Sequence, residues 1–278
     1  MTQFGYRQVD VFSATPLLGN PLAVVLGADG VSDETMARFA NWTNLSETTF
    51  LLTPTAPEAD YRLRIFTPAS ELPFAGHPTL GSCHVWLDAG GTPKGGDIIQ
   101  ECAAGLIRIR RGDSGLAFAA PPLIRSGAPD QASLQHAMDV LSLRPDQVVA
   151  AQWIDNGPGW LGLLLKSRAD VLAIQPDYAR LAGAEIGVVA PWSRLDDGDA
   201  ADFEVRAFMS EGSEDPVTGS LNAGIAMWLI GSGIAPPSYV AAQGTRLGRA
   251  GRVQVWQEGD TIWIGGQVVT CITGQVSL

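Results

Sequence analysis

The sequence predicts an α+β protein of two similar lobes, each with several short strands and one buried helix. The order of elements repeats, because in each half a strand is followed by a polar loop and then by a helix with almost no charge. Residues also recur at a nearly constant offset: Arg64 returns as Arg206, 142 positions later, and Gly76 returns as Gly219, 143 positions later. Such self-similarity indicates duplicated structural units.

The first lobe is expected to be mostly strands. Ser32 precedes Asp33 and Glu34, a pattern typical of the start of an exposed helix. A second helix is expected to begin near His77, and its residues are uncharged on all sides until Asp88, which is typical of a buried helix. Alternating or continuous apolar residues predict strands beginning at Tyr6 and at 22–26, 48–52, 61–66 and in short segments up to 120.

The second lobe is expected to repeat this plan. No residue from Val217 to Thr245 is charged, but Asn222, several glycines and a proline pair interrupt the stretch. A bilayer needs about 20 continuous apolar residues, so we expect a helix buried in protein. The predicted elements are helices at 131–141 and 219–230 and strands at 148–154, 160–165, 203–208, 251–257, 260–264 and 267–273.

Length and composition fit this organisation. The 278 residues allow two lobes of ordinary size, which we place at 1–125 and 126–278. With 46% hydrophobic and only 17% charged residues, the chain can build a sizeable core. The formal net charge of −11 disfavours nucleic acid and anionic membranes as partners.

The cysteines and the N-terminal segment bear on the compartment. Three cysteines without a C-x-x-C pair are not a disulfide framework, and no basic cluster followed by an apolar run starts the sequence. We therefore expect a cytoplasmic protein. The histidines lack the spacing of a metal site, so no metal is expected.

Two polar loops, 71–79 and 212–220, open the two buried helices. The start of a helix presents free N–H groups and a partial positive charge, which together favour an anion. Gly76 and Gly219 allow a ligand to approach the backbone there. If the lobes are related by pseudo-symmetry, we expect both helix starts to serve one cleft that holds a carboxylate.

Four motifs, in order along the chain, add a specific resemblance. NLSETTF, ELPFAGHPTLG, EDPVTGS and IWIGGQVV together resemble the phenazine-biosynthesis PhzF-like isomerase family, which shares the diaminopimelate epimerase fold. The resemblance implies a rolled, mainly antiparallel sheet around a central helix in each lobe, and a homodimer. It also implies a proton-transferring glutamate, Glu47, and a substrate site lined by His77, Asp215 and Ser220.

The positions where two-base epimerases of this fold carry cysteines hold other residues here, near Ala75 and near Pro216. A two-thiol racemase is therefore excluded, and a single-base isomerase remains. We expect a cofactor-independent isomerase of the trans-2,3-dihydro-3-hydroxyanthranilate type, acting on a small amino or aromatic carboxylate. Glu47 would need a pKa raised toward neutrality by burial, and His77 would be a neutral hydrogen-bond donor.

Two alternatives stay open. The first is a racemase or epimerase of a small amino or hydroxy acid, with Glu47 as one base and either His77 or Asp215 as the second. The second is a protein that binds small carboxylates in the same cleft without turnover.

Overall fold

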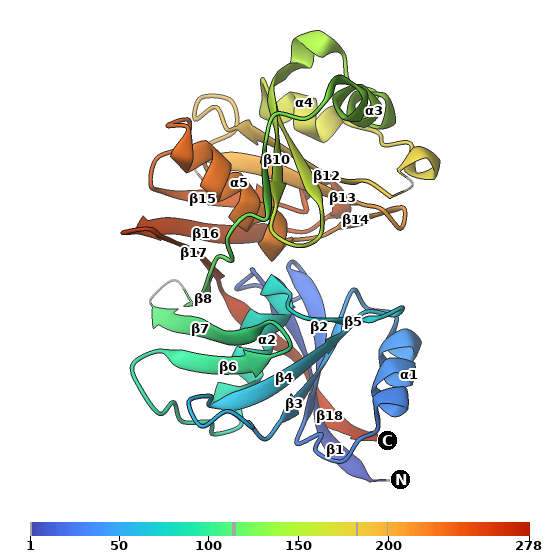
Figure 1. The fold of residues 1–278 in the computed structure, drawn as a ribbon, viewed down its shortest axis with the longest axis vertical. Helices are drawn as coiled ribbons and strands as arrows, with labels where there is room; N and C mark the ends of the chain where they lie inside the picture. Colours follow the sequence, from blue (N-terminus) through green and yellow to red (C-terminus); the bar gives the residue numbers. More distant parts are fainter. Residues whose placement is uncertain (1, 113–114, 182, 199) are drawn as a thin grey trace. The chain divides into compact units, whose positions relative to one another are not determined.

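The computed structural model describes residues 2–112, 115–181, 183–198 and 200–278. The chain forms two compact units. The first unit contains Met1–Ala119 together with Gly265–Leu278, and the second contains Ala120–Ile264. Each unit is a mainly antiparallel sheet with a long buried helix (Figure 1).

In the first unit the sheet order is β18-β1-β2-β3-β4-β6-β7-β8, and only the pairs β2/β3 and β4/β6 are parallel. The strands are β1 (Gln3–Val11), β2 (Asn20–Leu26), β3 (Thr48–Leu52), β4 (Tyr61–Phe66), β5 (Glu71–Leu72), β6 (Ile98–Cys102), β7 (Gly105–Gly112), β8 (Gly115–Ala119) and β18 (Val268–Ser277). The helices are α1 (Asp33–Thr43) and α2 (Gly76–Asp88). Figure 1 shows α2 enclosed by these strands, and it contacts β1, β2, β3, β4, β8 and β18.

The second unit has the same plan, with the order β9-β10-β11-β12-β13-β15-β16 and parallel pairs β11/β12 and β13/β15. Its strands are β9 (Arg125–Gly127), β10 (Val148–Asp155), β11 (Trp160–Leu165), β12 (Glu185–Pro191), β13 (Phe203–Met209), β14 (Ser213–Asp215), β15 (Ser238–Gln243), β16 (Gly251–Glu258) and most of β17 (Thr261–Gly266). Its helices are α3 (Gln131–Leu141), α4 (Arg168–Ala173) and α5 (Gly219–Gly231), with 3₁₀ turns at Pro145–Gln147, Tyr178–Arg180 and Thr245–Leu247. The predicted α+β fold of two similar lobes is confirmed.

The compact units are not continuous in the sequence. The last strand, β18, pairs with β1, so the end of the chain completes the first unit (Figure 1). The strand β9, which follows β8 along the chain, pairs instead with β10 of the second unit. The predicted lobes at 1–125 and 126–278 divide the chain once, according to the sequence repeat, and this division stays a prediction. The compact units of the structure divide the chain twice, at 119/120 and at 264/265.

Sequence patterns do not predict five helices and strands of the second unit, which are α4, β9, β12, β14 and β15. α4 has only six residues and gives too short a pattern for a periodicity to appear. β15 lies within the uncharged stretch after α5 and contains two alanines, which have low strand preference. None of the described helices has the length and apolarity needed to cross a membrane.

Glycines bring the buried helices close to their sheets. A Cβ atom on Gly81 of α2 would lie 2.6 Å from Leu22 Cδ2, and one on Gly224 of α5 would lie 2.4 Å from the Ile154 carbonyl oxygen. At Gly224 a larger residue would press on the strand backbone, whereas at Gly81 the nearest atom is the end of a side chain, which has to shift to make room.

This packing predicts opposite effects for two substitutions in the same helix. Gly224→Ala would press a methyl group against the backbone of β10, and we expect it to lower the free energy of unfolding by about 1–3 kcal/mol or more. Gly231→Ala meets no atom within 4 Å, and we expect it to raise that free energy by up to about 1 kcal/mol through helix propensity. Urea denaturation of both variants checks this, and equal effects would contradict the close packing.

Candidate active site

The first unit brings together Glu47 and His77. Glu47 directly precedes β3, in the turn that follows the left-handed cap residue Asn44 (φ 54°) at the end of α1. His77 is the second residue of α2. Glu47 Oε2 lies 3.3 Å from His77 Nε2, and the two side chains are only 15% and 5% exposed. Glu47 is therefore not the surface carboxylate that its residue type alone would suggest.

His77 is held in the neutral form. Burial lowers its pKa from 6.5 to about 3, because the charged imidazolium loses its hydration there. Its Nδ1 contacts the side-chain amide nitrogen of Asn20 at 3.3 Å. His77 Nε2 makes no hydrogen bond among the described residues, although Glu47 Oε2 lies 3.3 Å away. The imidazole thus faces Glu47 with a polar atom available to a ligand.

Neither buried helix has a side-chain cap. The N-cap residues are Ala75 for α2 and Thr218 for α5, and neither side chain accepts a hydrogen bond from its helix. The first-turn N–H groups at Gly76 and Gly219 therefore have no capping side chain, as an anion-binding helix start requires.

The second unit places Asp215 and Ser220 around the start of α5. Asp215 is the last residue of β14, and its Oδ2 accepts a 2.5 Å hydrogen bond from the Thr218 hydroxyl. It is not the cap of α5, whose N-cap residue is Thr218. Ser220 Oγ accepts from Trp160 Nε1 at 3.0 Å, and its carbonyl accepts from Asn156 Nδ2 at 2.8 Å.

Gln243 fixes the loop that carries Asp215. Its side chain is fully buried, and its Nε2 donates to the Asp215 carbonyl and to the Thr218 hydroxyl. Its Oε1 accepts from the Thr218 N–H at 3.0 Å and from Asn222 Nδ2 at 2.8 Å. Both donors and both acceptor positions of the Gln243 side-chain amide are therefore occupied, and these four hydrogen bonds fix the conformation of the loop.

The repeat extends to the ion pairs beside each helix start. Arg64 donates through Nε and one terminal nitrogen to both carboxylate oxygens of Glu71, and Arg206 does the same to Glu214. Each ion pair links two paired strands, β4 and β5 in the first unit and β13 and β14 in the second. In both units the shorter strand, β5 or β14, precedes the buried helix in the chain. Bidentate pairs of this kind hold orientation as well as charge.

The six predicted site residues therefore form two sets, each described within its own unit. Glu47, Gly76 and His77 belong to the first unit, while Asp215, Gly219 and Ser220 belong to the second.

The sequence patterns missed Asn20, Trp160 and Gln243. Asn20 sits in a Gly-Asn-Pro segment that indicates only a turn. Gln243 could have been found from the repeat, because Gln100 lies 143 positions earlier and is also fully buried, with its Nε2 donating to Thr79 of α2.

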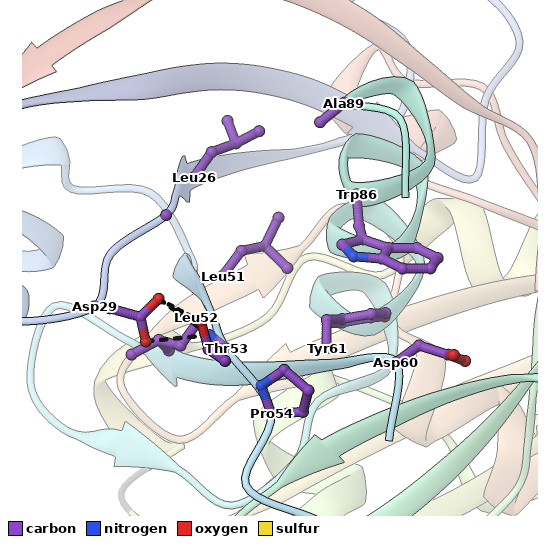
Figure 2. Close-up of a pocket in the computed structure, with 11 residues that line it drawn as sticks. Leu26, Asp29, Leu51, Leu52, Thr53, Pro54, Asp60, Tyr61, Trp86 and Ala89 are labelled. Carbon is purple, nitrogen blue, oxygen red and sulfur yellow. Dashed lines mark hydrogen bonds between the residues drawn. The ribbon is translucent and has the colours of Figure 1, made fainter. Parts of the chain in front are cut away.

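The first unit also has a cavity of about 330 Å³ that is separate from the predicted site residues. It contains none of the predicted site residues, and its lining is shown in Figure 2: Leu26, Gly27, Asp29, Leu51, Leu52, Thr53, Pro54, Asp60, Tyr61, Trp86 and Ala89. Asp29 accepts hydrogen bonds from the Thr53 N–H and hydroxyl (Figure 2), and Asp60 accepts from the N–H groups of Lys94 and Ile99. These carboxylates already serve to fix loops.

Comparison with known proteins decides the family. The family model described as phenazine biosynthesis-like protein matches residues 9–274, nearly the whole chain. The chain belongs to this family. The resemblance carried by the four motifs is thereby confirmed.

Relatives of this phenazine biosynthesis-like protein include named isomerases. Antisense-enhancing sequence 1 of Schizosaccharomyces pombe is 38% identical over 298 residues, 99% of each chain. An uncharacterized isomerase of Pasteurella multocida is 31% identical over 281 residues, 99% of this chain and 95% of its own. A trans-2,3-dihydro-3-hydroxyanthranilate isomerase of Pseudomonas aeruginosa is 53% identical over 77 residues, 28% of this chain and 27% of its own. This family member is accordingly an isomerase.

Solved structures agree on the fold. The crystal structure of a PhzF-family protein from Bacillus anthracis matches with a TM-score of 0.84 at 22% identity, covering 100% of both chains. A hydroxyproline epimerase of Agrobacterium vitis matches with a TM-score of 0.60 at 14% identity, over 99% of this chain and 93% of its own. The predicted diaminopimelate epimerase-like fold is confirmed.

Proposed function

We propose that this isomerase moves a proton between two carbons of a small amino or aromatic carboxylate, with Glu47 as its acid and base. The observation that carries the proposal is the largely buried Glu47 carboxylate facing the neutral His77. A base in such surroundings can take a proton from a carbon that conjugation has made acidic and return it to another carbon. The proton leaves and returns, so the reaction consumes no cofactor.

The other site residues are proposed to hold the substrate. His77 would donate from Nε2, while Asp215 and Ser220 would bind an amino group and a carboxylate. The N–H groups at Gly76 and Gly219 would add donors toward the negative charge that develops during proton transfer. Membership of the family supports these roles, as does the hydrogen bonding that fixes each loop.

The cysteines do not supply an alternative base. Cys83 is fully buried, and burial raises its pKa from 9.0 to about 12. Burial also raises the pKa values of Cys102 and Cys271. Thiols in such places stay protonated at neutral pH, which supports the proposal that the base is a carboxylate.

The substrate type is proposed to be that of the trans-2,3-dihydro-3-hydroxyanthranilate isomerases. The support is the 53% identity to such an enzyme, which is confined to 77 residues. A substrate of this kind carries the carboxylate and the conjugated carbon that the proposed chemistry requires. The cytoplasmic location and the homodimer stay predictions.

A substrate panel tests this function. The purified protein is incubated with trans-2,3-dihydro-3-hydroxyanthranilate and with small amino, hydroxy and aromatic carboxylates, and products are separated by chiral chromatography. A shift of a double bond or a proton between carbons is expected. Inversion at a single carbon would instead identify a racemase, and saturable binding without conversion across the panel would identify a binding protein.

A further inference from the structure

The position of Asn20 is fixed more firmly than a turn residue requires. Asn20 is the first residue of β2, fully buried, and paired in register with Val11 of β1. The preceding Gly19 donates its N–H to Asp10, and a Cβ atom on Gly19 would lie 2.3 Å from the Val11 carbonyl oxygen. This close backbone approach sets the side chain of Asn20 beside His77.

Two neighbours determine which nitrogen of His77 carries the proton. The amide nitrogen of Asn20 faces Nδ1 at 3.3 Å and can only donate, so Nδ1 must accept. A neutral imidazole has one proton, which then resides on Nε2. If the amide turned over and offered its oxygen, Nδ1 would carry the proton and the unprotonated Nε2 would lie 3.3 Å from Glu47 Oε2. An ionised Glu47 would repel the lone pair of that nitrogen.

The second unit has an equivalent contact between the first residue of a strand and the second residue of the buried helix. Its donor is an indole N–H, which, unlike an amide, cannot exchange donor and acceptor by turning over. Trp160 is the first residue of β11, as Asn20 is of β2, and Ser220 is the second residue of α5, as His77 is of α2. Trp160 Nε1 donates to Ser220 Oγ at 3.0 Å, and an indole nitrogen can only donate. The hydroxyl of Ser220 therefore keeps its own proton to donate elsewhere.

We propose that Asn20 is a positioning residue that holds His77 as the Nε2–H tautomer, so that the helix start beside Glu47 presents a hydrogen-bond donor. The role of this donor in catalysis rests on the proposed function. The position of the proton on His77 is independent of that function, and it can be measured on the protein without substrate.

Nitrogen NMR of the 278-residue protein tests the proposal. Uniformly ¹⁵N-labelled protein is studied by long-range ¹H–¹⁵N correlation, and Gln substitutions of His84 and His136 assign the remaining imidazole to His77, since the sequence has three histidines. We expect a protonated Nε2 and an unprotonated Nδ1 at every pH from 5 to 8, because burial keeps the imidazole neutral. A proton on Nδ1, or rapid averaging between both nitrogens, would overturn the proposal.

A variant of nearly equal shape adds a second test. Asn20→Asp replaces the donor with a carboxyl group that, once ionised, can only accept, so we expect a proton on Nδ1 of the folded variant at pH 8. Asn41→Asp makes the same change at an exposed amide that donates to the Pro68 carbonyl, and it should leave the His77 signals unchanged. Folded Asn20→Asp with the wild-type proton position refutes the role of Asn20. If the variant does not fold, the wild-type spectrum alone decides.

Activity then separates this inference from the proposed function. With a substrate from the panel, Asn20→Asp is expected to lower kcat at least tenfold with a smaller change in KM, and the loss should parallel the change of tautomer. If the spectra are as expected but no panel compound is converted, the proposed function fails while the positioning role stands.

Discussion

Replacing Glu47 with glutamine is expected to lower the turnover number by about 10²- to 10⁴-fold while the protein stays folded. Glutamine has nearly the same shape and can still form hydrogen bonds, but it neither takes nor gives a proton at neutral pH. Its neighbour His77 has a pKa of about 3 because of burial, and at neutral pH so weak a base cannot take over. Steady-state kinetics with the carboxylate that the panel identifies checks the expected loss.

Glu34 offers a matched control. Its side chain is 80% exposed in the first helix and is paired with Arg38, so Glu34→Gln makes the same chemical change away from the site. We expect its turnover number to equal that of the wild type. An unchanged thermal midpoint in Glu47→Gln shows that the fold persists, and a turnover number within threefold of wild type in that variant would remove Glu47 from the mechanism.

Removing the buried carboxylate of Glu214 is expected to lower the free energy of unfolding by about 3–5 kcal/mol. Glu214 is 3% exposed and binds Arg206, which is 4% exposed and also donates to two backbone carbonyls. Glu214→Ala leaves the guanidinium buried with its carboxylate partner gone, and a buried charge without a counter-ion is costly.

The repeat supplies the control for this second prediction. Glu71 makes the equivalent bidentate pair with Arg64, but the two side chains are 36% and 21% exposed. After Glu71→Ala the guanidinium keeps its ion pair with Asp33 and can be solvated by water, so we expect a loss of only about 0–1 kcal/mol. Urea denaturation compares the two variants, and losses of equal size would show that burial does not govern these pairs.

Much of the architecture follows from the sequence because it depends on local pattern. The uncharged helices at α2 and α5 stand out by composition, and the offset between Arg64 and Arg206 reveals the duplication. The pairing of β18 with β1 joins the two ends of the chain, and no local pattern indicates such a contact. The extent of the first unit therefore had to come from the structure.

The candidate site was predictable only in part. The family resemblance predicts Glu47 and His77, whereas composition alone would place a glutamate in that turn on the surface. Asn20 is 57 positions from His77, and Trp160 is 60 from Ser220. These contacts arise from packing between a strand and a helix, so turn and strand signals give no hint of them.

Deuterium incorporation tests the central claim, that Glu47 carries the transferred proton, most directly. Wild-type protein and Glu47→Gln are incubated with the same carboxylate in D₂O, and recovered substrate and product are examined by mass spectrometry and NMR. The wild type is expected to place deuterium on the reacting carbons, and Glu47→Gln is expected to place none above the protein-free rate. Incorporation by Glu47→Gln at the wild-type rate would contradict the account.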